Sequence, residues 1–378
     1  MDLALIALSA RPLAASAARA GFAALALDLF ADLDTCAHAA RCVRVHKRNG
    51  YAFDGDDLIQ ALGSLSPAGL PVVLGGGLED DPDLMARIAA RNPILGNSPE
   101  IVRVLKDPLA LAGLCGHLSV PFPEVTAEAP TQDTFGGAPV IEKKIGGAGG
   151  GHIRRRAAGD LSAPRHGYYL QREVKGEPYS LLLLANGRKA VVVGASRQWR
   201  DNDAEHPFRY GGVVGPVALP AAHAEAMREG AVRIALACGL VGLVSMDFVV
   251  SEDGWFLVEV NPRLGATLDI FDVDPLPPLL GLHLAACGGR VPEGLPTPSE
   301  IHAARVVYAE SDLLVPACTL PDHIADRPAA GAAIPKGAPV CTVRTSGPTI
   351  EAALARLDTL TAELRGELGF APVAEPAA

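Results

Sequence analysis

The sequence has few cysteines, and they follow no recognisable pattern. Seven cysteines are scattered over 378 residues, without a C-x-x-C pair or a paired histidine spacing. A disulfide framework or a structural zinc site would require such short, matched spacings. The sequence therefore predicts neither, and it favours a reducing compartment, the cytoplasm.

Long apolar runs and an excess of basic residues are also missing. No apolar run approaches the roughly 20 residues that span a bilayer, and Asp2 stands where a secretory signal needs positive charge. Asp and Glu number 43 against 33 Lys and Arg, a formal net charge of −10, which argues against nucleic acid or a membrane surface as partner. Aromatic residues make up only 5%, but 49% hydrophobic residues argue against disorder.

Two apolar, β-rich runs, residues 241–250 and 255–260, predict a β-hairpin. A three-residue loop that ends in Gly254, at a position with positive φ, would set Asp247 opposite Glu259. The strand period of two then places Asn261 on the same face as Glu259.

Facing carboxylates repel each other, so removing either charge should not destabilise the apoprotein. A divalent cation between Asp247 and Glu259 would remove the conflict, and oxygen ligands suit Mg²⁺ or Mn²⁺. The alternative is a hairpin whose acids point to water. Two features weigh against it: both acids lie inside apolar runs, and the turn at Asn261-Pro262-Arg263 aims a guanidinium at the same end. A guanidinium, with its several N–H donors, next to a divalent cation is suited to binding a polyphosphate.

A Gly-rich segment, IGGAGGG at residues 145–151, follows a predicted strand at 138–144. The backbone N–H groups of Gly149, Gly150 and Gly151 could fold over phosphates, with Lys144 as the countercharge. A flexible linker is the alternative, which the strand-like runs on both sides disfavour. The chain has no G-x-x-x-x-G-K-[ST], so the segment is not a P-loop. We expect a mobile lid here.

Asp247, the Glu-x-Asn-Pro-Arg run from Glu259 to Arg263 and this Gly-rich lid together resemble the ATP-grasp enzymes. The chain looks most like the branch of predicted ATP-dependent carboligases related to biotin carboxylase. The resemblance implies ATP, with Mg²⁺ on Asp247, Glu259 and Asn261. It also implies Lys144 on the α/β phosphates and Arg263 facing the transferring group, both as catalytic residues.

The resemblance also implies a nucleotide-binding hinge. Adenine would lie along Gln171, Arg172, Glu173 and Val174, and Glu177 would bind the ribose hydroxyls. Lys106 would touch the phosphates, but Lys106-Asp107 reverses the family's usual Asp-Lys order, and a surface lysine explains it equally well.

The predicted fold class is α/β with α+β grasp lobes. Strands and helices alternate over residues 1–95, which predicts a Rossmann-like parallel sheet. Residues 96–293 would form the ATP-grasp domain, with a lid lobe at about 120–170. Residues 294–378 would form a small C-terminal cap with a leucine-lined helix and a disordered tail from Ala371.

Substrate contacts are assigned to two further regions. By resemblance, Arg11 and the glycines at 75–77 lie at the acceptor-substrate site. A long polar loop is expected between residues 196 and 216. It carries Arg197, Trp199, Arg209 and Tyr210, which could hold a substrate or simply face solvent.

By resemblance the reaction is carboxylate–amine ligation: ATP forms an acyl phosphate, which an amine converts to an amide or peptide bond. The partners are then a small-molecule carboxylate and amine; a homodimer is left open. Biosynthesis of a pterin or furan C1 coenzyme is one candidate context. Two alternatives remain, a biotin-carboxylase-like carboxylase that uses bicarbonate and a non-catalytic ATP-binding protein.

Overall fold

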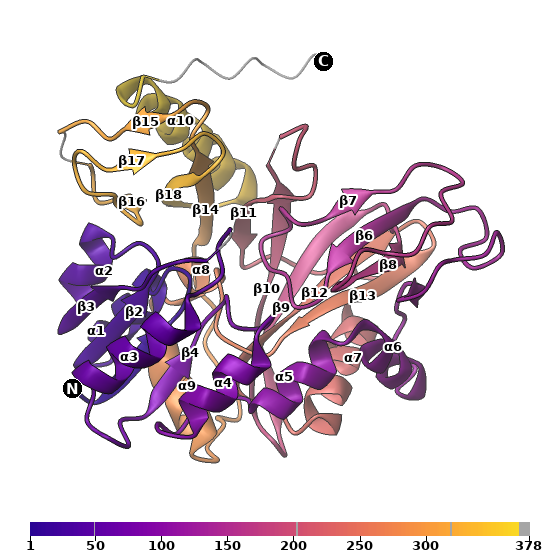
Figure 1. The fold of residues 1–378 in the computed structure, drawn as a ribbon, viewed down its shortest axis with the longest axis horizontal. Helices are drawn as coiled ribbons and strands as arrows, with labels where there is room; N and C mark the ends of the chain where they lie inside the picture. The colour runs from indigo at the N-terminus through magenta and orange to yellow at the C-terminus, as the bar shows by residue number, and fades with distance from the viewer. Residues whose placement is uncertain (49, 202, 318–319, 370–378) are drawn as a thin grey trace.

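The computed structural model describes residues 1–48, 50–201, 203–317 and 320–369. Their strands form a four-stranded parallel sheet, an eight-stranded antiparallel sheet, a second four-stranded sheet and a two-stranded ladder (Figure 1). The predicted α/β fold class is therefore confirmed. The predicted disordered tail from Ala371 lies outside the described residues. None of the described helices has the length and apolar character needed to cross a membrane.

The N-terminal segment is a parallel sheet with the strand order β3-β2-β1-β4. Its strands are β1 (Leu3–Ile6), β2 (Ala24–Asp28), β3 (Arg41–Arg44) and β4 (Val72–Leu74). Its helices are α1 (Arg11–Arg19), α2 (Leu33–His38), α3 (Gly55–Leu65) and α4 (Pro82–Ala89). The fully buried strands β1, β2 and β4 read as continuous apolar runs, as parallel sheets require. The edge strand β3, RCVR, carries arginines at both ends, so it is not a continuous apolar run and was not predicted from the sequence.

Two helices lead to the smaller sheet, which lies at one side of the molecule (Figure 1). They are α5 (Pro99–Lys106) and α6 (Pro108–His117). Ser98 caps α5 as its sequence suggests, because its side chain accepts from the Ile101 N–H at 3.4 Å. The sheet contains β5 (Val125–Thr126), β6 (Val140–Lys144), β7 (Arg154–Arg155) and β8 (Tyr168–Arg172), in the order β5-β8-β6-β7.

The large sheet runs in the order β13-β12-β9-β10-β11-β14-β18-β16. Its strands are β9 (Glu177–Asn186), β10 (Ala190–Arg200), β11 (Tyr210–Gly215), β12 (Val241–Ser251), β13 (Gly254–Asn261), β14 (Ile301–Tyr308), β16 (Ile324–Ala325) and β18 (Pro339–Gly347). The small ladder pairs β15 (Leu313–Leu314) with β17 (Ala333–Ile334). The remaining helices are α7 (Ala224–Ala237), α8 (Leu268–Phe271), α9 (Leu279–Cys287) and α10 (Ile350–Glu367).

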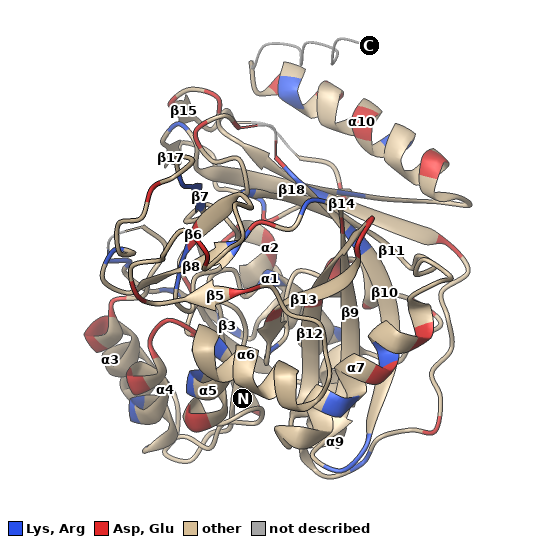
Figure 2. Cartoon of the chain, turned by 90° about the vertical axis from the view of Figure 1, so that its right-hand side faces the viewer, with Lys and Arg blue, Asp and Glu red and all other residues tan. Residues whose placement is uncertain are grey.

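The outer helices carry both signs of charge, as α4, α5, α7 and α10 show in Figure 2. On α10 the inward side is apolar: Leu357 and Leu364 are buried, with Leu354 and Leu360 packed beside them. The predicted leucine stripe is thus confirmed as core. The strands before α10 extend the large sheet, since β14 pairs with β11. The C-terminal segment therefore shares a sheet with the segment before it.

The predicted long loop at residues 196–216 is wrong. β10 continues to Arg200, β11 begins at Tyr210, and the two pair with Arg197 opposite Val214. Polar residues are compatible with these strands because only one face of an antiparallel sheet needs to be apolar. Trp199 packs across Gly212, where an added Cβ would lie 2.2 Å from the indole ring.

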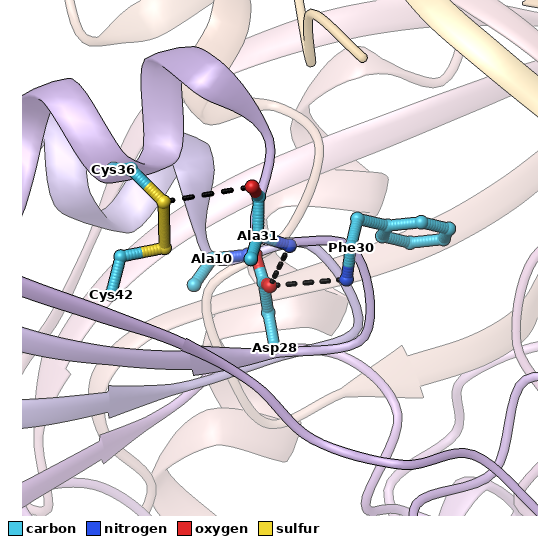
Figure 3. The surroundings of a disulfide bond; sticks show 6 residues. All are labelled: Ala10, Asp28, Phe30, Ala31, Cys36 and Cys42. Carbon is cyan, nitrogen blue, oxygen red and sulfur yellow. Dashed lines mark hydrogen bonds between the residues drawn. A yellow bond between two sulfur atoms is a disulfide. The ribbon is translucent and has the colours of Figure 1, made fainter. Parts of the chain in front are cut away.

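A disulfide joins Cys36 to Cys42, which corrects the expectation that no cysteines pair (Figure 3). The spacing of six residues matched no standard framework. Helix α2 ends at His38 and β3 starts at Arg41, and this reversal brings the two Cα atoms within 4.9 Å. The described remainder includes four free cysteines, at 115, 238, 287 and 341.

Candidate active site

The hairpin of β12 and β13 places Asp247 opposite Glu259, as predicted. The turn, however, is shorter than expected, because Ser251 pairs directly with Gly254. A register shift between Asp247 and Phe248 supplies the missing residue. A β-bulge thus re-aims the two acids, a role bulges often have beside active sites.

Asn261 and Lys106 complete a cluster around these acids. The Asn261 Nδ2 donates to Asp247 Oδ2 at 2.9 Å. The Lys106 ammonium donates to Glu259 Oε1 at 2.7 Å and to Asn261 Oδ1 at 2.8 Å. Lys106 is only 8% exposed, so it is not a surface lysine. The Glu259 and Asn261 oxygens thus contact the Lys106 ammonium, so the protein itself supplies the positive charge of this cluster.

The two acids differ in their electrostatics. Burial, together with the neighbouring Glu259, raises the pKa of Asp247 to about 6. Burial would also raise the pKa of Glu259, but Lys106 and Lys143 hold it below its ordinary value. In the described part of the chain, no three or more His, Cys, Asp or Glu side chains are grouped to hold a metal. A cation here would have two carboxylates and the Asn261 amide as protein ligands.

Arg263 lies at the same end of the hairpin, where the sequence predicts it. Its Nε donates to Glu79 Oε1 at 2.6 Å and its Nη2 to Asn261 Oδ1 at 3.3 Å. Burial would raise the pKa of Glu79, but Arg263, Lys106 and the Gly77 N–H lower it to about 2. Glu79 was missed from the sequence; its position just after the glycines at 75–77 was the available signal.

The two lysines at the end of β6 point to different places. Lys144 ion-pairs with Asp80 of the N-terminal segment at 2.6 Å. Lys143 is 8% exposed, and its Nζ lies 3.4 Å from Gln171 Oε1. Burial disfavours its charge, yet Tyr169 and Glu259 raise the pKa of Lys143 above its ordinary value. Lys143, which the sequence argument passed over, is therefore the β6 lysine that faces the acids. The alternation of side chains along a strand could have indicated this. Ile141 pairs with Gln171 and Lys143 with Tyr169, so Lys143 lies on the same face of the sheet as Gln171.

The Gly-rich segment lies against residues 208–210. The Tyr210 N–H donates to the Gly149 carbonyl at 2.9 Å. At Gly150, with φ +72°, an added Cβ would lie 1.9 Å from the Phe208 carbonyl oxygen, whereas at Gly151 it would meet nothing within 4 Å. The close approach at Gly150 admits no side chain. The opening of this segment as a lid stays a prediction.

The predicted hinge residues lie along β8 and its continuation. Gln171 is 2% exposed, and its Nε2 has no hydrogen-bond partner among the described residues. Glu173 is buried and paired with Arg155 at 2.8 Å. A buried amide donor without a partner is costly and fits a ligand that brings an acceptor, such as an adenine ring.

The other hinge residues are less enclosed. Arg172 ion-pairs with Glu124 and lies over the Phe256 ring. Val174 is buried, and Glu177 is an exposed residue at the start of β9.

Some of the residues assigned to acceptor binding line one of two cavities, and others line neither. Arg11 is buried and bound to Asp269 and to Asp326. It lines a cavity of about 250 Å³ with Gly75, Gly76, Tyr210 and Arg263. Arg209 lines a larger cavity of about 620 Å³, described below. Neither cavity has Arg197 or Trp199 in its lining.

Comparison with known proteins identifies the central region. The family described as ATP-grasp domain matches residues 110–267. The large chain of carbamoyl phosphate synthase from Deinococcus radiodurans is 26% identical over 233 residues, 56% of this chain and 22% of that one. The chain thus spans about a fifth of the length of this relative.

Solved structures match over nearly the whole length. The biotin carboxylase domain of Hydrogenobacter thermophilus 2-oxoglutarate carboxylase, a dimer bound to MgADP, ADP and bicarbonate, gives a TM-score of 0.73 at 14% identity, over 94% of this chain and 88% of that one. Biotin carboxylase from Campylobacter jejuni, solved in a β-γ-ATP complex, gives 0.71 at 14% identity, over 94% and 90%. The predicted resemblance is confirmed: residues 110–267 match the ATP-grasp domain family, and the chain has the fold of the biotin carboxylases.

Proposed function

We propose that this protein is an ATP-dependent ligase that joins an organic carboxylate to an amine through an acyl phosphate. The observation that carries this proposal is the cavity of about 620 Å³ beside the Gly-rich segment. Its walls include Phe30, Tyr51 and Tyr308. A largely apolar space of this size suits organic substrates.

The residues around the hairpin fit the nucleotide and its metal. Asp247, Glu259 and Asn261 would hold Mg²⁺, which neutralises phosphate charge during phosphoryl transfer. Gln171 Nε2, which has no partner among the described residues, would read adenine. The H. thermophilus structure with this fold is a complex with MgADP. Lys143 would hold the phosphates, and Arg263 would face the transferring group.

The alternative of a carboxylase that uses bicarbonate has less support. Bicarbonate is a small anion and calls for a compact basic pocket. The smaller cavity contains Arg11 and Arg263, but these are already paired with Asp269 and Glu79. The large cavity is instead lined by the acids Asp32, Asp80 and Asp326 as well as by Arg209 and Lys144. Asp80 and Asp326 are paired with Lys144 and Arg11, whereas Asp32 has no partner among the described residues and favours a substrate with an amino group.

The reaction is tested by measuring ADP release with different acceptors. We expect slow release with ATP alone and strong stimulation when a carboxylate and an amine are added together, because an acyl phosphate needs its acceptor to turn over. A set of amino acids, glutamate included, and pterin- or furan-related acids should be combined with amines. Stimulation by bicarbonate alone would favour the carboxylase, and release of AMP and pyrophosphate would exclude the proposed acyl-phosphate ligase.

A second test concerns the Gly-rich segment. Gly150→Ala should lower turnover at least about tenfold, because the added Cβ collides with the Phe208 carbonyl and positive φ costs an L-residue about 1–2 kcal/mol. Gly151→Ala is the matched control, since its Cβ meets open space. Steady-state ADP release and thermal melting of both variants are compared with the wild type. Equal activity of the two variants would contradict a close-packed role for Gly150.

A further inference from the structure

The loop between β2 and α2 forms part of the wall of the large cavity. The Asp28 carboxylate accepts hydrogen bonds from the backbone N–H groups of Ala10 at 3.0 Å, Phe30 at 3.1 Å and Ala31 at 2.6 Å (Figure 3). Ala31 has φ +51°, a conformation that turns the chain sharply. These bonds fix the loop, and Phe30 and Asp32 both line the cavity.

Asp32 is buried, and its carboxylate has no partner among the described residues. It is 8% exposed and, although it is the N-cap residue of α2, its side chain accepts no capping hydrogen bond. No hydrogen bond or ion pair to its carboxylate occurs within residues 1–48, 50–201, 203–317 and 320–369. A nearly buried carboxylate without a protein partner is unfavourable, and a proton or a cation from the cavity would stabilise it.

The other charged groups of the cavity wall are already paired. Lys144 pairs with Asp80 at 2.6 Å and Arg209 with Asp203 at 3.0 Å. Asp326 is held by Arg11 at 3.1 Å. Within the described lining, Asp32 is therefore the acid whose charge nothing balances.

The neighbours of Asp32 strengthen its attraction for a cation. Burial, followed by the charges of Asp326, Asp28 and Asp34, raises the pKa of Asp32 to about 8, and Arg11 opposes this only in part. The described residues offer no three-ligand metal cluster. An organic cation is thus the better match.

Building on the proposed ligase function, we propose that Asp32 binds the amino group of the amine substrate as an ammonium ion, which gives up its proton before it attacks the acyl phosphate, while Phe30 and Tyr51 contact its apolar part. The two rings lie 6.1 Å apart with a tilt of 42°, and both line the cavity with Asp32. Aromatic faces beside a carboxylate suit an alkylammonium group, since rings attract cations as well as apolar carbon. The substrate class is an arylalkyl or long-chain alkyl amine.

The test uses 2-phenylethylamine and its neutral analogue 2-phenylethanol, titrated calorimetrically into the nucleotide-free protein at pH 8.5. The amine should bind at least about tenfold more tightly than the alcohol, and Asp32→Asn should remove this preference, as expected for a buried charge pair. Asp83→Asn is the control for net charge, because Asp83 is an exposed residue of α4 whose side chain is 89% accessible. It should leave both affinities unchanged.

The pH profile of the wild type provides a readout that needs no variant. Only ionised Asp32 attracts the ammonium, so the affinity should rise about tenfold per pH unit below 8 and level off above it. Asp32→Asn should flatten this rise, and thermal melting checks that it folds.

The proposal is overturned if the amine binds no better than the alcohol, if no binding is seen, or if Asp32→Asn keeps the preference. Because no ATP is present, these outcomes are independent of ligase turnover.

Discussion

Asp247→Asn is expected to reduce ATP-dependent turnover by about a thousandfold, since a metal that neutralises phosphate charge contributes several kcal/mol. The apoprotein should be as stable as the wild type or more so, because the substitution removes a buried acid whose pKa Glu259 helps to raise. ADP release and thermal melting with and without Mg²⁺-ATP measure both effects. Full turnover with a wild-type thermal shift would refute the metal assignment.

Glu259→Gln should also abolish turnover, but its effect on stability should differ. Glu259 is ion-paired with the buried Lys106 at 2.7 Å, so losing its charge leaves that ammonium undercompensated. The Glu259 side chain is 30% exposed, so we expect the free energy of unfolding to fall by about 1–3 kcal/mol, the usual cost of leaving a buried donor unsatisfied. The sequence alone predicted no loss for either acid, because it could not reveal that Lys106 pairs with Glu259. If both variants melt alike, this ion pair contributes little.

Lys143→Met should lower kcat/KM for ATP by about 100- to 1,000-fold, the usual loss when one charge-stabilising group is removed from a water-excluded site. Lys144→Met is the matched control on the same strand. Lys144 is already paired with Asp80, so we expect its loss to change kcat/KM only a few fold.

Steady-state kinetics with varied ATP compare these two lysine variants, and thermal melting confirms that both fold. A larger loss at Lys144 than at Lys143 would reinstate the assignment made from the sequence.

Local periodicity accounts for what could be predicted. The period of two along β12 and β13 was enough to pair Asp247 with Glu259. The bulge beside Asp247 offset the error in the predicted turn, so the pairing was right although the loop was not. Continuous apolar runs likewise revealed the buried strands of the parallel sheet.

What escaped prediction depends on contacts between distant segments. Spacing to the glycines favoured Lys144, but the face of β6 that meets Gln171 carries Lys143. Glu79 acquires its role only because the N-terminal segment meets Arg263. Asp32 lies in the wall of a cavity that the N-terminal, central and C-terminal parts of the chain build together. No local sequence pattern could therefore reveal that its carboxylate has no partner among the described residues.

The pairing of β14 and β18 with the large sheet has a consequence for synthesis on the ribosome. The last part of the cavity wall to be made is the run of residues 339–342 on β18. Until these residues leave the exit tunnel, a nascent chain can carry every proposed nucleotide contact and still lack an enclosed acceptor site. Order of translation would thus separate the two halves of the proposed chemistry, because every residue proposed to bind ATP is made before the last part of the cavity wall.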